Sequence, residues 1–183
     1  MAMQSKVNKK RWLFPSLIVL MRVLFGIGWL LAGVTKISEK LWFKEPGVFL
    51  NEYLISALEK PNVPLFYKVF IENVALEYVM ALNYVIPIVQ IILGVLIIIG
   101  LLTIPSILIC LFMHINFILS GNMNLMSLVL YTSTFTLIIF RTEIYHLSLD
   151  KYFNLDILLT TNENKREKNN SMPPEKERLL SNT

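Results

Sequence analysis

Four long apolar stretches separated by short polar segments dominate the pattern of this chain. They occupy residues 13–37, 82–103, 105–120 and 125–140. A helix needs about 20 residues to cross about 30 Å of hydrocarbon, and about 17 suffice for a short or upright span. Because a backbone in lipid must satisfy its own hydrogen bonds, such stretches form helices. The pattern therefore predicts an all-α fold, a four-helix transmembrane bundle.

The segment between the first two spans, residues 38–81, is expected to form a helical loop. Pro46–Leu58 and Pro64–Leu82 each place a proline in the first turn of a predicted helix. On the second helix, Lys68 and Glu72 share a polar face, and the opposite face is apolar. Its apolar residues are Phe66, Val69, Phe70, Val74 and Tyr78. This helix either lies on the membrane surface or packs against the end of the bundle.

The flanking charges predict the orientation and the domain limits. Residues 1–12 form a basic arm, residues 13–153 the four-span membrane domain, and residues 154–183 a polar tail expected to be disordered and cytoplasmic. Lys and Arg near span ends favour the cytoplasmic side. With four crossings, we expect both termini in the cytoplasm of a multi-pass cell-membrane protein and the loop 38–81 outside.

Composition supports the membrane assignment and excludes several classes of function. The chain has 183 residues, is 55% hydrophobic and carries a formal net charge of +4. Its basic runs lack interleaved aromatics, so we expect no nucleic-acid partner. The single cysteine, Cys110, allows no intrachain disulfide, CxxC pair or iron–sulfur cluster. A redox role would therefore need a non-covalent cofactor or a partner protein.

Polar side chains inside the spans are the candidate functional residues. Arg22 lies about nine residues into the first span, which corresponds to a depth of about 14 Å. The same count places a polar group from every span near the midplane. The predicted cluster consists of Arg22, Gln90, His114, Asn116, Tyr131 and Thr134. Lys36 is expected at its outer mouth.

Each member of this cluster has a structural interpretation as well as a functional one. An intramembrane arginine must face inward and be hydrogen-bonded. Arg22 either receives an anionic or carbonyl-bearing ligand or joins helices by hydrogen bonds. His114 is either a packing residue or a ligand contact, and no neighbouring carboxylate or second histidine predicts a metal site. The small residues Gly26, Gly28, Ala32 and Gly33 lie close together on the first span and are expected to pack against a helix, and Gly28 and Ala32 have the spacing that permits close helix approach. The sequence holds no motif that identifies catalytic residues.

Four segments in order resemble the DoxX/DoxD family of membrane proteins. They are "MRVLFGIGWLLAGVTKI" (21–37), "QIILGVLIIIGLLT" (90–103), "NFILSG" (116–121) and "LSLDKYF" (147–153). The resemblance implies four membrane helices, and the DoxD-like members are most similar. Some members are subunits of thiosulfate:quinone oxidoreductase. The family commonly has Glu where this chain has Gln90, so a charge pair with Arg22 is not expected here.

Together these features predict a membrane subunit that supports quinone-linked oxidoreduction, with small sulfur anions as candidate electron donors. The chain would bind quinone or anchor a soluble or membrane-bound redox partner. Whether it is itself catalytic stays open at this stage. The alternative is a non-enzymatic membrane scaffold or a small-solute permeation protein.

Overall fold

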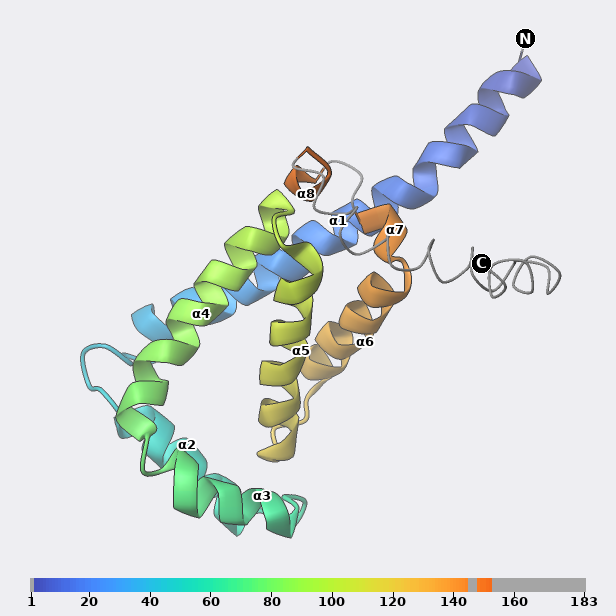
Figure 1. Ribbon diagram of the computed structural model, residues 1–183. Coiled ribbons are helices and arrows are strands. Elements are labelled where there is room, and N and C mark those ends of the chain that lie inside the picture. The colour runs from blue at the N-terminus through green and yellow to red at the C-terminus, as the bar shows by residue number, and fades with distance from the viewer. Residues whose placement is uncertain (1, 145–147, 153–183) are drawn as a thin grey trace, which may run out of the picture.

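The computed structural model describes the backbone of residues 2–144 and 148–152, and all regular structure in these residues is helical. The long helix α1 (Ala2–Ser38) runs beside α4 (Val79–Ile99). Helix α5 (Thr103–Leu119) packs against α4 and α6 (Leu125–Ile139), and α6 also contacts α1 (Figure 1). The expected all-α fold is confirmed. Residues 2–12 continue α1, and the predicted tail 154–183 lies outside the described residues.

Two helical segments are long and apolar enough to cross a membrane, Leu13–Ser38 and Val79–Ile99. They match the first two predicted spans to within about four residues at each end. Helices α5 and α6 are apolar but shorter, with 17 and 15 residues. At about 1.5 Å per residue, they measure about 26 Å and 23 Å.

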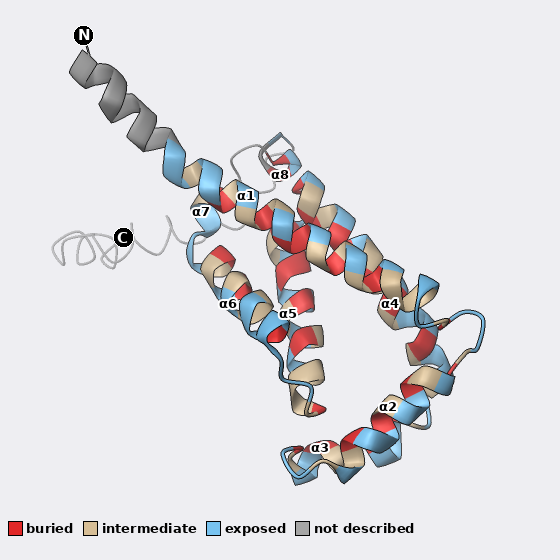
Figure 2. Ribbon diagram, turned by 180° about the vertical axis from the view of Figure 1, so that it is seen from behind, coloured by how far each residue is buried: buried red, intermediate tan, exposed pale blue. Residues whose placement is uncertain are grey.

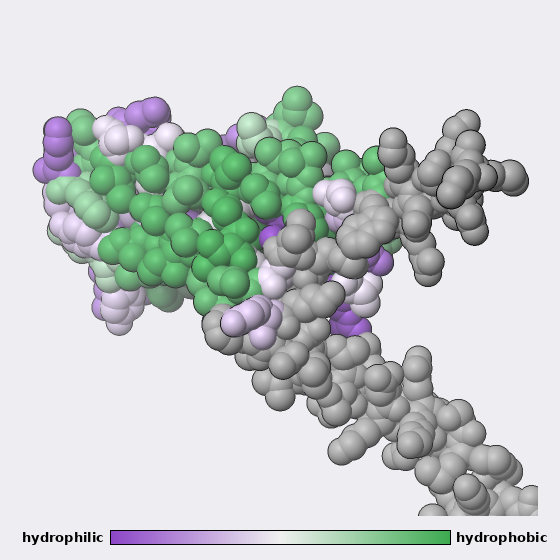
Figure 3. All heavy atoms as spheres, turned by 90° about the horizontal axis from the view of Figure 1, so that it is seen from above, coloured by the Kyte–Doolittle hydropathy of each residue, from purple (hydrophilic) through white to green (hydrophobic). Residues whose placement is uncertain are grey.

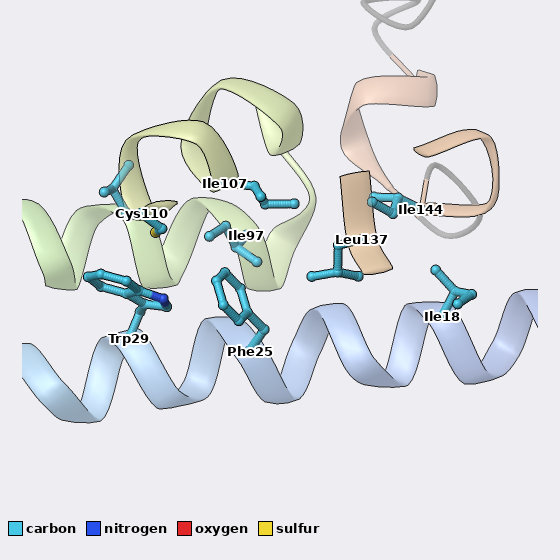
Figure 4. Close-up of a cluster of buried hydrophobic side chains, with 9 residues drawn as sticks. Ile18, Phe25, Trp29, Ile97, Ile107, Cys110, Leu137 and Ile144 are labelled. Atoms are coloured by element: carbon cyan, nitrogen blue, oxygen red, sulfur yellow. The ribbon is translucent and has the colours of Figure 1, made fainter. Parts of the chain in front are cut away.

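A buried core joins these four helices. Phe25 of α1 points toward Ile97 of α4, and Trp29 lies toward Cys110 of α5, with Leu137 of α6 in the same cluster (Figure 4). Aromatic and branched aliphatic side chains bury large apolar areas, so this cluster fixes which helix faces meet.

Close backbone contact sets the register between α1 and α4. A Cβ added to Gly94 would lie 2.6 Å from Leu30 N and 2.9 Å from Gly26 O. Gly33 similarly approaches Pro87 O and the Gln90 side chain. Gly28, for which the sequence suggested such packing, instead faces the Leu130 side chain at 3.6 Å. Small residues therefore do bring the helices together: among those predicted to pack, Gly26 and Gly33 make the close contacts with α4, whereas Gly28 does not.

The loop forms a second cluster at one end of the molecule. It contains α2 (Val48–Glu59), α3 (Leu65–Phe70) and the π-helical segment η1 (Ile71–Ala75), packed around buried Trp42. The predicted continuous helix Pro64–Leu82 is therefore wrong: residues 76–78 form a turn before α4 begins.

The α3–η1 segment has both apolar residues that pack against the rest of the protein and apolar residues that stay on the surface. Tyr67, Ile71 and Ala75 pack inward, whereas Phe66 and Val69 stay exposed (Figure 2). A third face, not the predicted apolar one, makes the packing contact.

The exterior of the helices is also apolar. Every one of α1, α4, α5 and α6 exposes large hydrophobic side chains, and Figure 3 shows a broad hydrophobic face. Examples are Leu24, Leu31, Ile88, Ile92, Leu108, Phe112, Val129 and Phe135. Contiguous apolar surface of this extent is typical of lipid or protein contact.

Candidate functional site

A cavity of about 330 Å³ lies between the bundle and the loop, and we refer to it as the polar cavity. Helices α1, α4, α5 and α6 form its walls, and α2 with the segment before it covers one side. The residues that line it are Gly28, Trp29, Ala32, Thr35, Lys36, Lys40, Trp42, Phe49, Leu50, Tyr53, Gln90, His114, Phe117, Asn122, Asn124, Met126, Ser127 and Leu130. Its volume lies within the usual range of small-molecule sites.

Lys36 places a positive charge in this cavity. Its Nζ donates a hydrogen bond to Ala32 O (3.2 Å) and lies 5.9 Å from the Trp42 ring centroid and 5.4 Å from that of Phe117. Lys40 also lines the cavity, and none of its lining residues is acidic. Cation–π contacts hold an ammonium in place without neutralising it. The cavity therefore favours a ligand with negative or carbonyl oxygen atoms.

Three side chains in the wall contain a buried polar atom with no hydrogen-bond partner among the described residues. These atoms are Trp29 Nε1, Trp42 Nε1 and Gln90 Oε1. Gln90 is only 2% exposed. Most buried polar groups in folded proteins are hydrogen-bonded. The wall therefore offers a ligand two unused hydrogen-bond donors, the indole N–H groups of Trp29 and Trp42, and one unused acceptor, the Gln90 side-chain oxygen.

His114 is held in one orientation by α6. Its Nε2 lies 2.8 Å from Ser127 O. Because a carbonyl oxygen only accepts, Nε2 carries the hydrogen in this hydrogen bond. Tyr131 packs near this ring, with centroids 6.1 Å apart. His114 thus combines a packing role with a place in the cavity wall.

The structure brings together only part of the predicted cluster. Lys36, Gln90 and His114 line the polar cavity, with Tyr131 behind the His114 ring. Thr134 is buried and donates its hydroxyl to Leu130 O (2.8 Å). The Thr134 hydroxyl therefore bonds to the backbone of its own helix, α6.

A second cavity, also about 330 Å³, receives Asn116. We call it the apolar cavity; it lies between α4 and α5 under α2, α3 and η1. Asn116 Nδ2 donates to Phe112 O (2.8 Å), and Tyr67 Oη donates to Asn116 O (3.0 Å). Asn116 therefore does not belong to the polar cavity, contrary to the prediction.

Arg22 also lies outside the predicted cluster. Its Nη1 donates to Ile144 O (2.8 Å), and a Cβ added to Gly100 would lie 2.8 Å from the same nitrogen. Gln90 lies ten residues before Gly100 on α4, which is about 15 Å along the helix axis. The prediction that Arg22 shares a level with Gln90 is wrong. Its contacts fit the interpretation in which Arg22 joins helices.

Asp150 is the residue that the sequence reasoning missed. It interacts electrostatically with Arg22, and its two carboxylate oxygens accept from Leu102 N (2.7 Å) and Thr103 N (2.9 Å). At the start of a helix such N–H groups have no carbonyl partner within the helix, and here Asp150 accepts from them. Asp150 N in turn donates to Gly100 O (2.9 Å). The short helix α8 (Leu149–Tyr152) thereby caps α5 and provides the negative charge that no span contains.

The signal for Asp150 was present in the family-like segment "LSLDKYF". Its carboxylate lies outside the predicted spans, so counting charges within the spans could not find it. Gly100 at φ 73° and Leu102 at φ 50° shape the α4–α5 turn around this carboxylate. A left-handed backbone at a leucine is uncommon and needs such support.

Two loop tyrosines provide neutral hydroxyl groups beside the cavities. Burial raises the pKa of Tyr53, partly offset by hydrogen bonds from Ser120 and Asn122, and Tyr53 Oη pairs with Ser120 Oγ. Burial, reinforced by Tyr53, raises the pKa of Tyr67 to about 12. Both tyrosines therefore stay protonated at neutral pH.

No family model, curated protein or solved structure matches this chain. The two cavities and the residues around them are therefore the features of the molecule that indicate its function.

Proposed function

We propose that the chain is a multi-pass membrane protein in which α1, α4, α5 and α6 cross the bilayer. The apolar exterior of all four helices supports this proposal, because a water-soluble bundle would carry polar residues there. In this proposal α2, α3 and η1 cover the extracytoplasmic end, and both termini are cytoplasmic. Membership of the DoxX/DoxD family, DoxD-like, is part of the proposal. Supporting it, Arg22 and Asp150, which come from two of the family-like segments, interact.

The proposed role is to bind a quinone within a membrane oxidoreductase system. One observation on the polar cavity supports this proposal most strongly: the Lys36 ammonium lies against aromatic rings in a cavity without acidic lining residues. A quinone has a flat ring and carbonyl oxygens, which suit aromatic walls and hydrogen-bond donors. When bound, it would supply reversible two-electron chemistry.

Lys36 would then have a defined part in that chemistry. A fixed ammonium next to a carbonyl oxygen stabilises negative charge that develops there. Gln90 would orient the ring, and the His114 ring, held by Ser127, would form the wall behind it. Electrons would come from a redox partner, with small sulfur anions as candidate donors.

Tryptophan fluorescence offers a direct binding test. Trp29 and Trp42 line the cavity, so a Trp12→Phe background leaves both cavity reporters as the remaining tryptophans. Titration with a benzoquinone should quench them saturably. Lys36→Met should weaken binding by about tenfold or more, because a hydrogen bond to a charged group contributes about 1.5–3 kcal/mol.

The matched control is Lys44→Met, which removes an exposed lysine that lines neither cavity. It should bind like the parent protein. Quenching that rises linearly without saturation, or equal effects of both substitutions, would refute quinone binding at Lys36. Solute flux through liposomes that is lost in Gln90→Leu, without quinone binding, would favour the permeation alternative.

A further inference from the structure

We infer that the apolar cavity receives the hydrocarbon tail of the molecule whose polar head occupies the polar cavity. This inference rests on the proposed function and specifies its ligand class. The ligand is then a tailed molecule dissolved in the bilayer, and a free, water-borne head group is not the intended occupant.

The two cavities are neighbours in the wall of the same bundle. Leu50, Tyr53 and Phe117 line both of them, so the two cavities share these side chains as a common wall. In this inference the ligand, with its head beside Lys36, extends past the Phe117 ring into the second cavity.

The chemistry of the two walls differs in the way that a head and a tail require. The polar groups of the apolar cavity are already paired with one another: Tyr67 with Asn116, and Tyr53 with Ser120. Unlike the wall of the polar cavity, with its unpaired Gln90 oxygen, this lining is otherwise mainly aliphatic and aromatic. It offers dispersion contacts to a hydrocarbon chain and little to a polar ligand.

The apolar cavity also reaches the hydrophobic exterior. Several of its lining residues are exposed, among them Phe70, Val85, Ile109 and Phe112, the last with 68% of its surface accessible. Val85, Ile109 and Phe112 lie on α4 and α5, so in this proposal part of the lining is exposed on the face assigned to lipid. A tail can therefore enter sideways from the bilayer.

Energetics determine how this subsite must be tested. Lipid is as apolar as the cavity wall, so moving a tail from the bilayer gives little net hydrophobic gain. The cavity would contribute fit and position. The informative quantity is thus the affinity for a tailed quinone divided by that for its tail-less head, compared between protein variants. Partition of the ligand into lipid cancels in this comparison.

The test uses the full chain in nanodiscs and the same fluorescence titration. The two probes are a dimethoxy-methyl-benzoquinone and the same head carrying a decyl tail. Val85→Phe puts a larger side chain at the exposed edge of the apolar cavity without adding a tryptophan to the titration, and Val95→Phe is its control. Both valines are exposed on α4, and Val95 lines neither cavity.

Val85→Phe should lower the tailed-to-tail-less affinity ratio by about tenfold, because the larger side chain occupies space that the tail would fill. Val95→Phe should leave the ratio unchanged. An unchanged ratio in Val85→Phe overturns the tail subsite, even when the head still binds and Lys36→Met still weakens it. Failure of both probes to bind the parent protein instead overturns the proposed function itself, so the two failures are distinguishable.

Discussion

Substitution of Gly94 by alanine tests the register that positions both cavities. The α1–α4 contact has no room for a methyl group at this position, because the added Cβ would lie 2.6 Å from Leu30 N and 2.9 Å from Gly26 O. Both neighbours are backbone atoms, so no side-chain rotation can relieve the overlap. The two helices would have to separate.

The expected magnitude follows from two opposing effects. Overpacking a tightly packed site costs up to about 3 kcal/mol. Replacing glycine by alanine inside a helix returns about 1 kcal/mol through helix propensity. Gly94→Ala should therefore lower the free energy of unfolding by about 2 kcal/mol.

Gly28→Ala provides a control in the partner helix with the opposite expected sign. Its added Cβ would meet only Leu130 Cδ2, at an ordinary contact distance of 3.6 Å. The propensity gain of up to about 1 kcal/mol then stands without a packing cost. The free energy of unfolding of both variants can be measured by SDS titration in mixed micelles, followed by circular dichroism. A Gly94→Ala protein as stable as the parent, or a Gly28→Ala protein equally destabilised, would refute the assigned register.

Two further predictions concern the ends of the bundle. Asp150→Ala removes two hydrogen bonds from backbone N–H groups to a buried carboxylate, which should lower the free energy of unfolding by about 3 kcal/mol. The control Glu52→Ala, at an exposed residue, should change the free energy of unfolding by less than about 0.5 kcal/mol. Equal effects of the two substitutions in the same titration would contradict the cap. At the other end, the Tyr67 pKa rises from 10.0 to about 12 on folding. Because folding favours the protonated phenol, the free energy of unfolding is unaffected by this group below pH 10 and falls as the pH rises toward 12. Unfolding titrations at pH 9 and 11.5 should show a smaller pH effect in Tyr67→Phe, and an identical effect in both proteins would contradict the assigned pKa.

The helices could be predicted from the sequence because apolar length and turn residues are local signals. The turn at Gly121 was identifiable in this way, and Asn124 caps α6 directly after it by accepting from Ser127 N. The packing of the loop was not identifiable. The α3–η1 segment has apolar residues around most of its circumference, so the pattern could not show that Tyr67 and Ile71 would face inward.

The position of Arg22 shows why depth could not be predicted by counting residues. The count assumed independent helices that start at the same membrane surface. In the structure, the contact of Gly26 with Gly94 sets the register, and Arg22 lies one turn before Gly26. Side chains on a helix point toward its N-terminus. The guanidinium therefore reaches Gly100, and this register is a tertiary property that a single sequence does not encode locally.

Lys36, Gln90 and His114 do line one cavity, so the sequence pointed to three of its polar residues. Each lies on a different helix, and each is polar within an apolar stretch, which is a strong signal in a membrane sequence. The tryptophans of the wall, Trp29 and Trp42, were not predicted, because an aromatic residue in an apolar stretch resembles ordinary core.

Photoaffinity labelling with an azido-benzoquinone tests the central claim most directly. After illumination of the protein in nanodiscs, mass spectrometry identifies the labelled peptides. The account predicts labelling in the segments 28–53 and 114–130, which contain Lys36 and His114, and protection of both by excess unlabelled quinone. Labelling spread over the exposed lipid-facing residues, unaffected by unlabelled quinone, would contradict it.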